Sequence, residues 1–160
     1  MAVIPEDSAK CFVGQAFLSD SLFCALTAQS RASLDRIKHH RRFKKGSRIL
    51  EIGQTPGGIF LLRAGRARYM FKPQGGGEGE MFIRFAEPDE ILGLTEMLAG
   101  RGCEVSLETL SSCDGDFIER EDFIRFLLAE PDVCFRLLRQ LGLNLQKCCQ
   151  TFCDLCHKTG

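Results

Sequence analysis

The sequence has no excess of charge of either sign, since 21 lysines and arginines balance 21 aspartates and glutamates. A chain without net charge has no overall field that would draw it to nucleic acid or to an anionic membrane. Its N-terminal stretch also lacks the pattern of a signal peptide or a spanning helix, because Glu6 and Asp7 come early and Asp20 interrupts its apolar residues. We therefore expect a cytoplasmic protein that does not enter a membrane.

Sequence motifs of the common enzyme classes are missing as well. The chain contains no P-loop, no Gly-x-Ser-x-Gly nucleophile elbow and no His-Glu-x-x-His zinc motif. A single tyrosine, Tyr69, and three histidines leave few candidates for general acid–base catalysis. We expect that the chain is not an enzyme, and we assign no catalytic residue.

The cysteines do not have the numbers of a disulfide framework. There are nine in 160 residues, an odd count and a smaller share than small secreted scaffolds carry. In a reducing compartment they stay mostly as thiols. A hydrophobic content of 44% and this chain length instead favour one domain with a substantial core.

What the sequence does contain is a middle region of short apolar stretches separated by glycine and proline. Such spacing favours strands of a β-sandwich or barrel. Around Gly65, two of the stretches have the pattern of a hairpin, and Gly75–Gly79 has the pattern of an exposed hairpin tip. The expected strands are Ile49–Ile52, Ile59–Leu62, Ala67–Phe71, Met81–Phe85, Glu104–Leu107 and Gly115–Ile118.

Helical patterns flank this region. Apolar spacing over Ser21–Ile37 predicts a helix or two short helical turns, and Glu121–Leu128 predicts another helix. Pro131 suits the first position of a last helix that runs to about Cys156. The basic cluster Lys38–Lys45, with its two histidines, is interpreted as a charged, solvent-exposed turn.

The last helix carries an unbroken heptad pattern. Its apolar residues are spaced alternately by four and three positions, as in the a and d positions of a coiled coil. The pattern predicts a parallel homodimer, and the alternative is a helix buried within one domain. The expected dimer seam consists of Cys134, Leu138, Leu141, Leu145, Cys148, Phe152 and Leu155.

The β-rich middle and the last helix together resemble the effector domain of the CRP/FNR superfamily of bacterial transcription regulators. The resemblance covers roughly residues 17–155 and implies a jelly-roll, or double-stranded β-helix, of the cyclic-nucleotide-binding type with a long C-terminal dimerisation helix. Residues 1–16 show no clear period and are expected to form an N-terminal arm, followed by a β-roll with flanking helices (17–130) and the dimerisation helix (131–157). The pieces that carry the resemblance are Phe43–Gly46, Ile49 with Gly53, Gly58–Leu62 with Gly65, Pro88–Gly93, and Ile118, Asp122, Phe123, Phe126 and Leu127 leading to Pro131.

In relatives that bind cyclic nucleotides, a Gly-Glu element and a following Arg-Ser/Thr pair hold the cyclic phosphate. At the far end of the corresponding segment, this chain has Cys103 and Glu104 in place of the cationic pair, and Arg101 lies two residues out of register. Cyclic nucleotide binding is therefore disfavoured, and an unknown small effector or no effector stays open. The resemblance places the candidate effector pocket at Gly93, Leu94, Thr95, Glu96, Arg101, Cys103 and Glu104, with Thr95 as a possible helix cap.

A cysteine cluster at the end of the last helix offers an alternative function. Cys149, Cys153 and Cys156 share one helix face, and Cys148 lies at the seam. In a dimer these thiols could bind zinc or an iron–sulfur centre, or form an interchain disulfide. The simpler interpretation is that cysteine serves there as a small apolar residue, so we assign no metal and no certain cofactor.

Regulators of the resembling family continue from the long helix into a helix-turn-helix that contacts DNA. The residues after this helix are too few for that, and we expect no DNA-binding domain in this chain. The resulting hypothesis is a dimeric sensor domain that passes the status of a small effector or a redox signal to a DNA-binding domain elsewhere. The alternatives are a stand-alone cyclic-nucleotide-binding module and a metal or redox switch.

Overall fold

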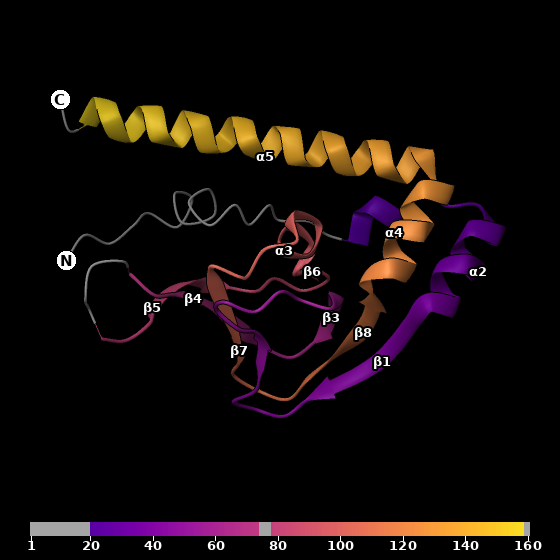
Figure 1. Cartoon of the computed structure of the whole chain (residues 1–160), viewed down its shortest axis with the longest axis horizontal. Coiled ribbons are helices and arrows are strands. Elements are labelled where there is room, and N and C mark those ends of the chain that lie inside the picture. Colours follow the sequence, from indigo (N-terminus) through magenta and orange to yellow (C-terminus); the bar gives the residue numbers. More distant parts are fainter. Residues whose placement is uncertain (1–19, 74–77, 159–160) are drawn as a thin grey trace.

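The computed structural model describes residues 20–73 and 78–158, and Figure 1 shows their arrangement. The described part begins with short helices, continues through the strands and ends in one long helix. The expected arm (1–16) and residues 75–77 of the expected hairpin tip lie outside the described residues. The helices are η1 (Asp20–Phe23), α2 (Ala28–Ile37), α3 (Leu94–Ala99), α4 (Arg120–Ala129) and α5 (Pro131–Lys158). The strands are β1 (Lys38–Phe43), β2 (Arg48–Leu50), β3 (Gly58–Ala64), β4 (Ala67–Phe71), β5 (Met81–Phe85), β6 (Ile91–Leu92), β7 (Val105–Thr109) and β8 (Cys113–Glu119).

The strands form two antiparallel sheets of four, one in the order β1-β8-β3-β6 and the other in the order β2-β7-β4-β5. Each sheet therefore combines strands from the beginning and the end of the roll, which is the arrangement of a jelly roll. The expected fold class, mainly β with flanking helices and a long C-terminal helix, is confirmed. All six expected strands lie within two residues of their predicted bounds.

One expected pairing is wrong. The stretches on either side of Gly65 do not form a hairpin, because β3 belongs to one sheet and β4 to the other. Gly65 has a φ of +101°, and a Cβ there would lie 2.4 Å from the carbonyl oxygen of Ser112. The glycine therefore allows the chain to turn tightly from one sheet into the other. A hairpin turn also favours glycine, so the sequence alone does not distinguish the two cases.

The expected turn over the basic cluster is also wrong. Lys38–Phe43 forms strand β1, which pairs antiparallel with β8 at the edge of its sheet. The guanidinium of Arg42 donates to both carboxylate oxygens of Asp114, at 2.9 and 3.3 Å, and the Nε2 of His40 lies 3.4 Å from the same carboxylate. Because residues 38–42 are all lysine, histidine or arginine, the strand shows no hydrophobic alternation in the sequence.

The interior is divided between two hydrophobic clusters. One joins the helices to the outer side of the β1-β8-β3-β6 sheet, and rings of Phe23, Phe123 and Phe126 meet in it at centroid distances of 6.2–6.5 Å. The other fills the space between the sheets, around Tyr69 and Leu107. The first cluster fixes the helices to the roll, and the second forms the roll's own interior.

Helix α5 packs on this core only over its first turns. Val133 and Leu137 are 1% and 3% exposed, and Leu141 packs partly against the helical cluster. Beyond that point the helix extends along the molecule with no fully buried residue among those described (Figure 1). Most of the length of α5 thus projects from the single chain. No helix among the described residues is long and apolar enough to cross a membrane.

Candidate functional site

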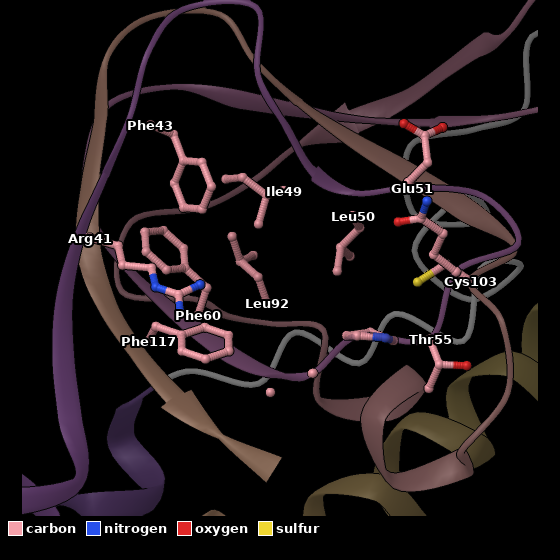
Figure 2. A pocket seen from close by; sticks show the side chains of 14 residues that line it. Arg41, Phe43, Ile49, Leu50, Glu51, Thr55, Phe60, Leu92, Cys103 and Phe117 are labelled. Atoms are coloured by element: carbon pink, nitrogen blue, oxygen red, sulfur yellow. The ribbon is translucent and has the colours of Figure 1, made fainter.

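A cavity of about 310 Å³ lies inside the roll, between the two sheets (Figure 2). Strands β1, β2, β3, β6 and β8 contribute to its wall, together with the segment that joins β2 to β3. Its volume lies at the lower end of the range of about 300–1,000 Å³ that is usual for small-molecule sites. The lining residues are Arg41, Phe43, Ile49, Leu50, Glu51, Gln54, Thr55, Pro56, Gly57, Gly58, Phe60, Leu92, Cys103 and Phe117.

One side of the cavity is aromatic. Phe43 and Phe60 meet edge to face with their ring centroids 5.2 Å apart, and the ring of Phe117 lies nearby from β8. The guanidinium carbon of Arg41 stands 3.8 Å from the centre of the Phe117 ring, within cation–π distance. The cavity thus combines apolar rings with one cation on the same side.

Polar groups occupy the opposite side. Glu51, Thr55 and Cys103 are seen there in Figure 2. Two backbone bonds hold Cys103 in place, because its N–H donates to the carbonyl of Gln54 and its own carbonyl accepts from Gly53, both at 2.9 Å. Burial, followed by the charge of Glu96, raises the pKa of the Cys103 thiol to about 11. At neutral pH this residue is therefore a neutral, buried thiol.

Of the seven residues predicted for an effector pocket, Cys103 alone lines this cavity. Gly93 precedes α3, and Leu94 is buried in the helical core. Thr95 lies inside α3 and is not its cap, so that prediction was wrong: the N-cap is Gly93, which has no side chain to donate or accept. Sequence spacing had placed the helix start one or two residues too late.

The three charged residues of the predicted pocket also lie away from the cavity wall. Arg101 and Glu104 are exposed, and Glu96 is partly buried in α3. Burial raises the pKa of Glu96, and the nearby carboxylates of Glu104 and Glu90 raise it further. No residue of the segment 93–104 therefore brings a positive charge to the cavity.

Sequence reasoning missed Arg41 and Phe117 as site residues. Arg41 was assigned to a charged turn, and Phe117 was counted only as part of a strand. Strand alternation is the signal that could have identified Arg41. In a strand over 38–43, the side chains of Arg41 and Phe43 lie on the face that lines the cavity, and Arg42 lies on the other face beside Asp114.

The predicted dimer seam is largely uncovered in the single chain. Leu138, Leu145 and Phe152 are 61%, 65% and 68% exposed. Cys134, Leu141 and Cys148 are partly buried, and the side chain of Leu155 lies outside the described part. Three large apolar residues at heptad spacing thus face outward from a helix whose first turns belong to the core.

The cysteine cluster at the end of α5 does not form a ligand set within one chain. Cys149, Cys153 and Cys156 are exposed along the helix, and Cys148 is partly buried. Among the residues that the structure describes, no three histidine, cysteine or acidic side chains lie close enough together to hold a metal ion.

Several solved structures have a similar fold. The catabolite activator protein of Thermus thermophilus matches with a TM-score of 0.73 and 20% identity, over 85% of this chain and 62% of that protein. The sensor domain of the transcriptional regulator DNR from Pseudomonas aeruginosa matches with a TM-score of 0.67 and 15% identity, over 79% and 83% of the two chains. The N-terminal domain of a transcriptional regulator from Streptomyces coelicolor A3(2) matches with a TM-score of 0.63 and 20% identity, over 84% and 92%.

At these identities the likeness concerns the fold, and the chain spans less than two thirds of the Thermus protein. No curated protein matches the chain significantly in sequence. The family model of the cyclic nucleotide-binding domain matches residues 40–130, which is more than half of the chain. This match and the shared fold confirm the resemblance to the effector domains of CRP/FNR-type regulators. The chain therefore belongs to the cyclic nucleotide-binding domain family.

Proposed function

We propose that this chain is the sensor domain of a CRP/FNR-type transcription regulator, which dimerises through α5 and binds a small effector in the roll cavity. The family consists of regulatory domains that are typically not catalytic, and the proposed role is sensing. Contact with DNA would be made by a separate domain of the regulator, and we place the regulator in the cytoplasm.

The observation that carries this proposal is the exposed seam of α5. An apolar stripe of Leu138, Leu145 and Phe152 extends from a helix that is fixed at Val133 and Leu137. Solvent-exposed residues of this size at heptad spacing are typical of a helix that packs against a second helix. A parallel copy of the same helix fits this pattern, because each a and d residue then meets its own counterpart.

The roll cavity supports the sensory part of the proposal. Phe43, Phe60 and Leu92 of its wall belong to or pack against the roll interior, and β8, which contributes Phe117, leads directly into α4. Helix α4 in turn contacts α5. A ligand that changes the position of β8 would therefore act on the dimer helix through α4, which is the connection that a sensor domain requires.

The experiment is a comparison of Leu145→Glu with Gln146→Glu by size-exclusion chromatography with light scattering. Both substitutions add one negative charge at neighbouring, exposed positions of α5, but only Leu145 lies in the seam. We expect Leu145→Glu to be monomeric and Gln146→Glu to remain dimeric, with equal helicity. Two variants with the same mass, whether both dimeric or both monomeric, would contradict a dimer built on the seam.

A further inference from the structure

We propose that the roll cavity selects an aromatic monocarboxylate, whose carboxylate pairs with Arg41 and whose ring lies among the phenylalanines. This inference rests on the proposed sensory function and adds the chemical class of the effector. The effector is thereby distinguished from a cyclic nucleotide held by the segment 93–104.

The cation of the cavity is Arg41. Arg41 lines the cavity and places its guanidinium against the face of the Phe117 ring. Among the described residues, no carboxylate lies within ion-pair distance of Arg41, although the other arginines of the strands each have one. The pairs are Arg42–Asp114, Arg48–Glu80, Arg63–Asp89, Arg68–Glu108 and Arg84–Glu90.

A guanidinium that stacks on a ring keeps its N–H edge available. That edge presents donors in a planar fork, which matches the two oxygens of a carboxylate. Arg41 is exposed at the mouth of the cavity, so a carboxylate meets its charge there while the rest of the ligand enters the apolar part. Arg41 is thus placed to receive an anion from within the cavity.

The charges of the cavity wall limit the charge of the ligand. Glu51 lines the opposite side and opposes any ligand with a large negative charge. One cation and one anion across the same cavity suit a ligand with a single negative charge directed at Arg41. A phosphate monoester, with nearly two charges at neutral pH, fits this balance less well.

The apolar part of the cavity wall indicates what the uncharged part of the ligand is. Phe43, Phe60 and Phe117 gather beside Arg41, and Leu50, Ile49 and Leu92 continue the wall (Figure 2). An aromatic ring adds further edge-to-face contacts to the Phe43–Phe60 pair, and such contacts are favourable beyond the burial of area. The small volume favours one ring system over a nucleoside.

The experiment is calorimetric titration of the intact chain with benzoate, phenylacetate and 3-phenylpropionate. The matched ligands are their neutral amides, and cyclic AMP is a separate arm. The variants are Arg41→Gln and, as the matched control, Arg42→Gln, which removes the next cation of the same strand on the opposite face. We expect at least one carboxylate to bind about tenfold or more tightly than its amide. Arg41→Gln should abolish this difference, and Arg42→Gln should keep it.

Four outcomes would overturn the inference. The first three are equal affinity for acid and amide, an equal loss in both variants, and no heat from any carboxylate at millimolar concentration. Tighter binding of cyclic AMP than of every carboxylate would overturn it as well. None of these results changes the mass of the dimer, so a failed ligand assignment is distinguishable from a failed dimeric sensor, which the Leu145→Glu comparison tests.

Discussion

Arg84 and Glu90 form an ion pair inside the protein, where their side chains are 3% and 0% exposed. Two guanidinium nitrogens of Arg84 donate to the two carboxylate oxygens of Glu90, one of them at 3.1 Å. The carboxylate also accepts from the hydroxyl of Tyr69 at 3.3 Å and from the backbone N–H of Glu87 at 2.7 Å. This network joins β4 and β5 to the start of β6 in the wall of the roll.

The members of the network shift one another's pKa values and so fix one another's protonation states. Burial alone lowers the pKa of Arg84, and the hydrogen bond and charge of Glu90 outweigh that effect and raise it. Burial and the charge of Glu90 raise the pKa of Tyr69 well above its ordinary value, so the tyrosine remains a neutral donor. The Nε of Arg84 is buried without a partner among the described residues.

Arg84→Met should lower the free energy of unfolding by about 3–5 kcal/mol, because it leaves the Glu90 carboxylate buried without its cation. Replacing both residues, as Arg84→Met with Glu90→Leu, should recover much of this loss. Urea unfolding measures both. The control is Arg125→Met, since Arg125 is 77% exposed beside Asp122 and such a pair contributes only about 0–1 kcal/mol. Similar losses for Arg84→Met and Arg125→Met would contradict the buried network.

Leu137→Ala and Leu138→Ala should affect different equilibria, although the residues are adjacent in α5. Leu137 is buried in the helical core, and its truncation should cost about 2–5 kcal/mol at every protein concentration. Leu138 is 61% exposed in the single chain, and its truncation should matter only where the dimer is populated. Urea unfolding at several protein concentrations separates the two effects. A loss of stability in Leu137→Ala that varies with protein concentration would contradict these placements. So would a Leu138→Ala variant whose stability equals that of the wild type at every concentration.

Glu96 should make the protein less stable as the pH rises. Its pKa is raised in the folded state above its ordinary value of 4.5, chiefly by burial. The unfolded chain therefore releases this proton first. The contribution of Glu96 is fully present below the ordinary pKa and is lost as the pH rises through the folded-state pKa. Glu96→Gln removes this dependence.

The measurement is thermal unfolding of the wild type and of Glu96→Gln between acidic and neutral pH. We expect the melting temperature of the variant, relative to the wild type, to increase with pH across this interval. The exposed Glu78→Gln is the control and should show no such trend. A constant difference between Glu96→Gln and the wild type would show that burial does not perturb this carboxyl.

Much of the fold could be predicted from the sequence, because apolar runs and turn residues mark the roll's strands well. Pro131 and the heptad spacing likewise predicted a helix from Pro131 to about Cys156, and α5 spans Pro131–Lys158. The order of the strands could not be predicted in the same way. Gly65 indicates a tight turn, but local sequence does not distinguish a turn within one sheet from a passage between two sheets.

The candidate site was less accessible to sequence reasoning. Segment 93–104 was chosen by resemblance, and the structure places only its Cys103 in the cavity wall. Arg41 was missed because β1 is basic and its partner strand carries Asp114, so the strand lacks hydrophobic alternation. A strand whose pairing depends on charges from a distant segment becomes visible only when both segments are placed together.

Sedimentation equilibrium of the unmodified chain, in reducing buffer and over a wide concentration range, tests the central claim most directly. The chain has a mass of 17.9 kDa. We expect a reversible approach to twice that mass without any disulfide, because Leu138, Leu145 and Phe152 of one α5 cover those of another. A mass that stays at the monomer value up to the highest concentration would contradict the dimeric sensor.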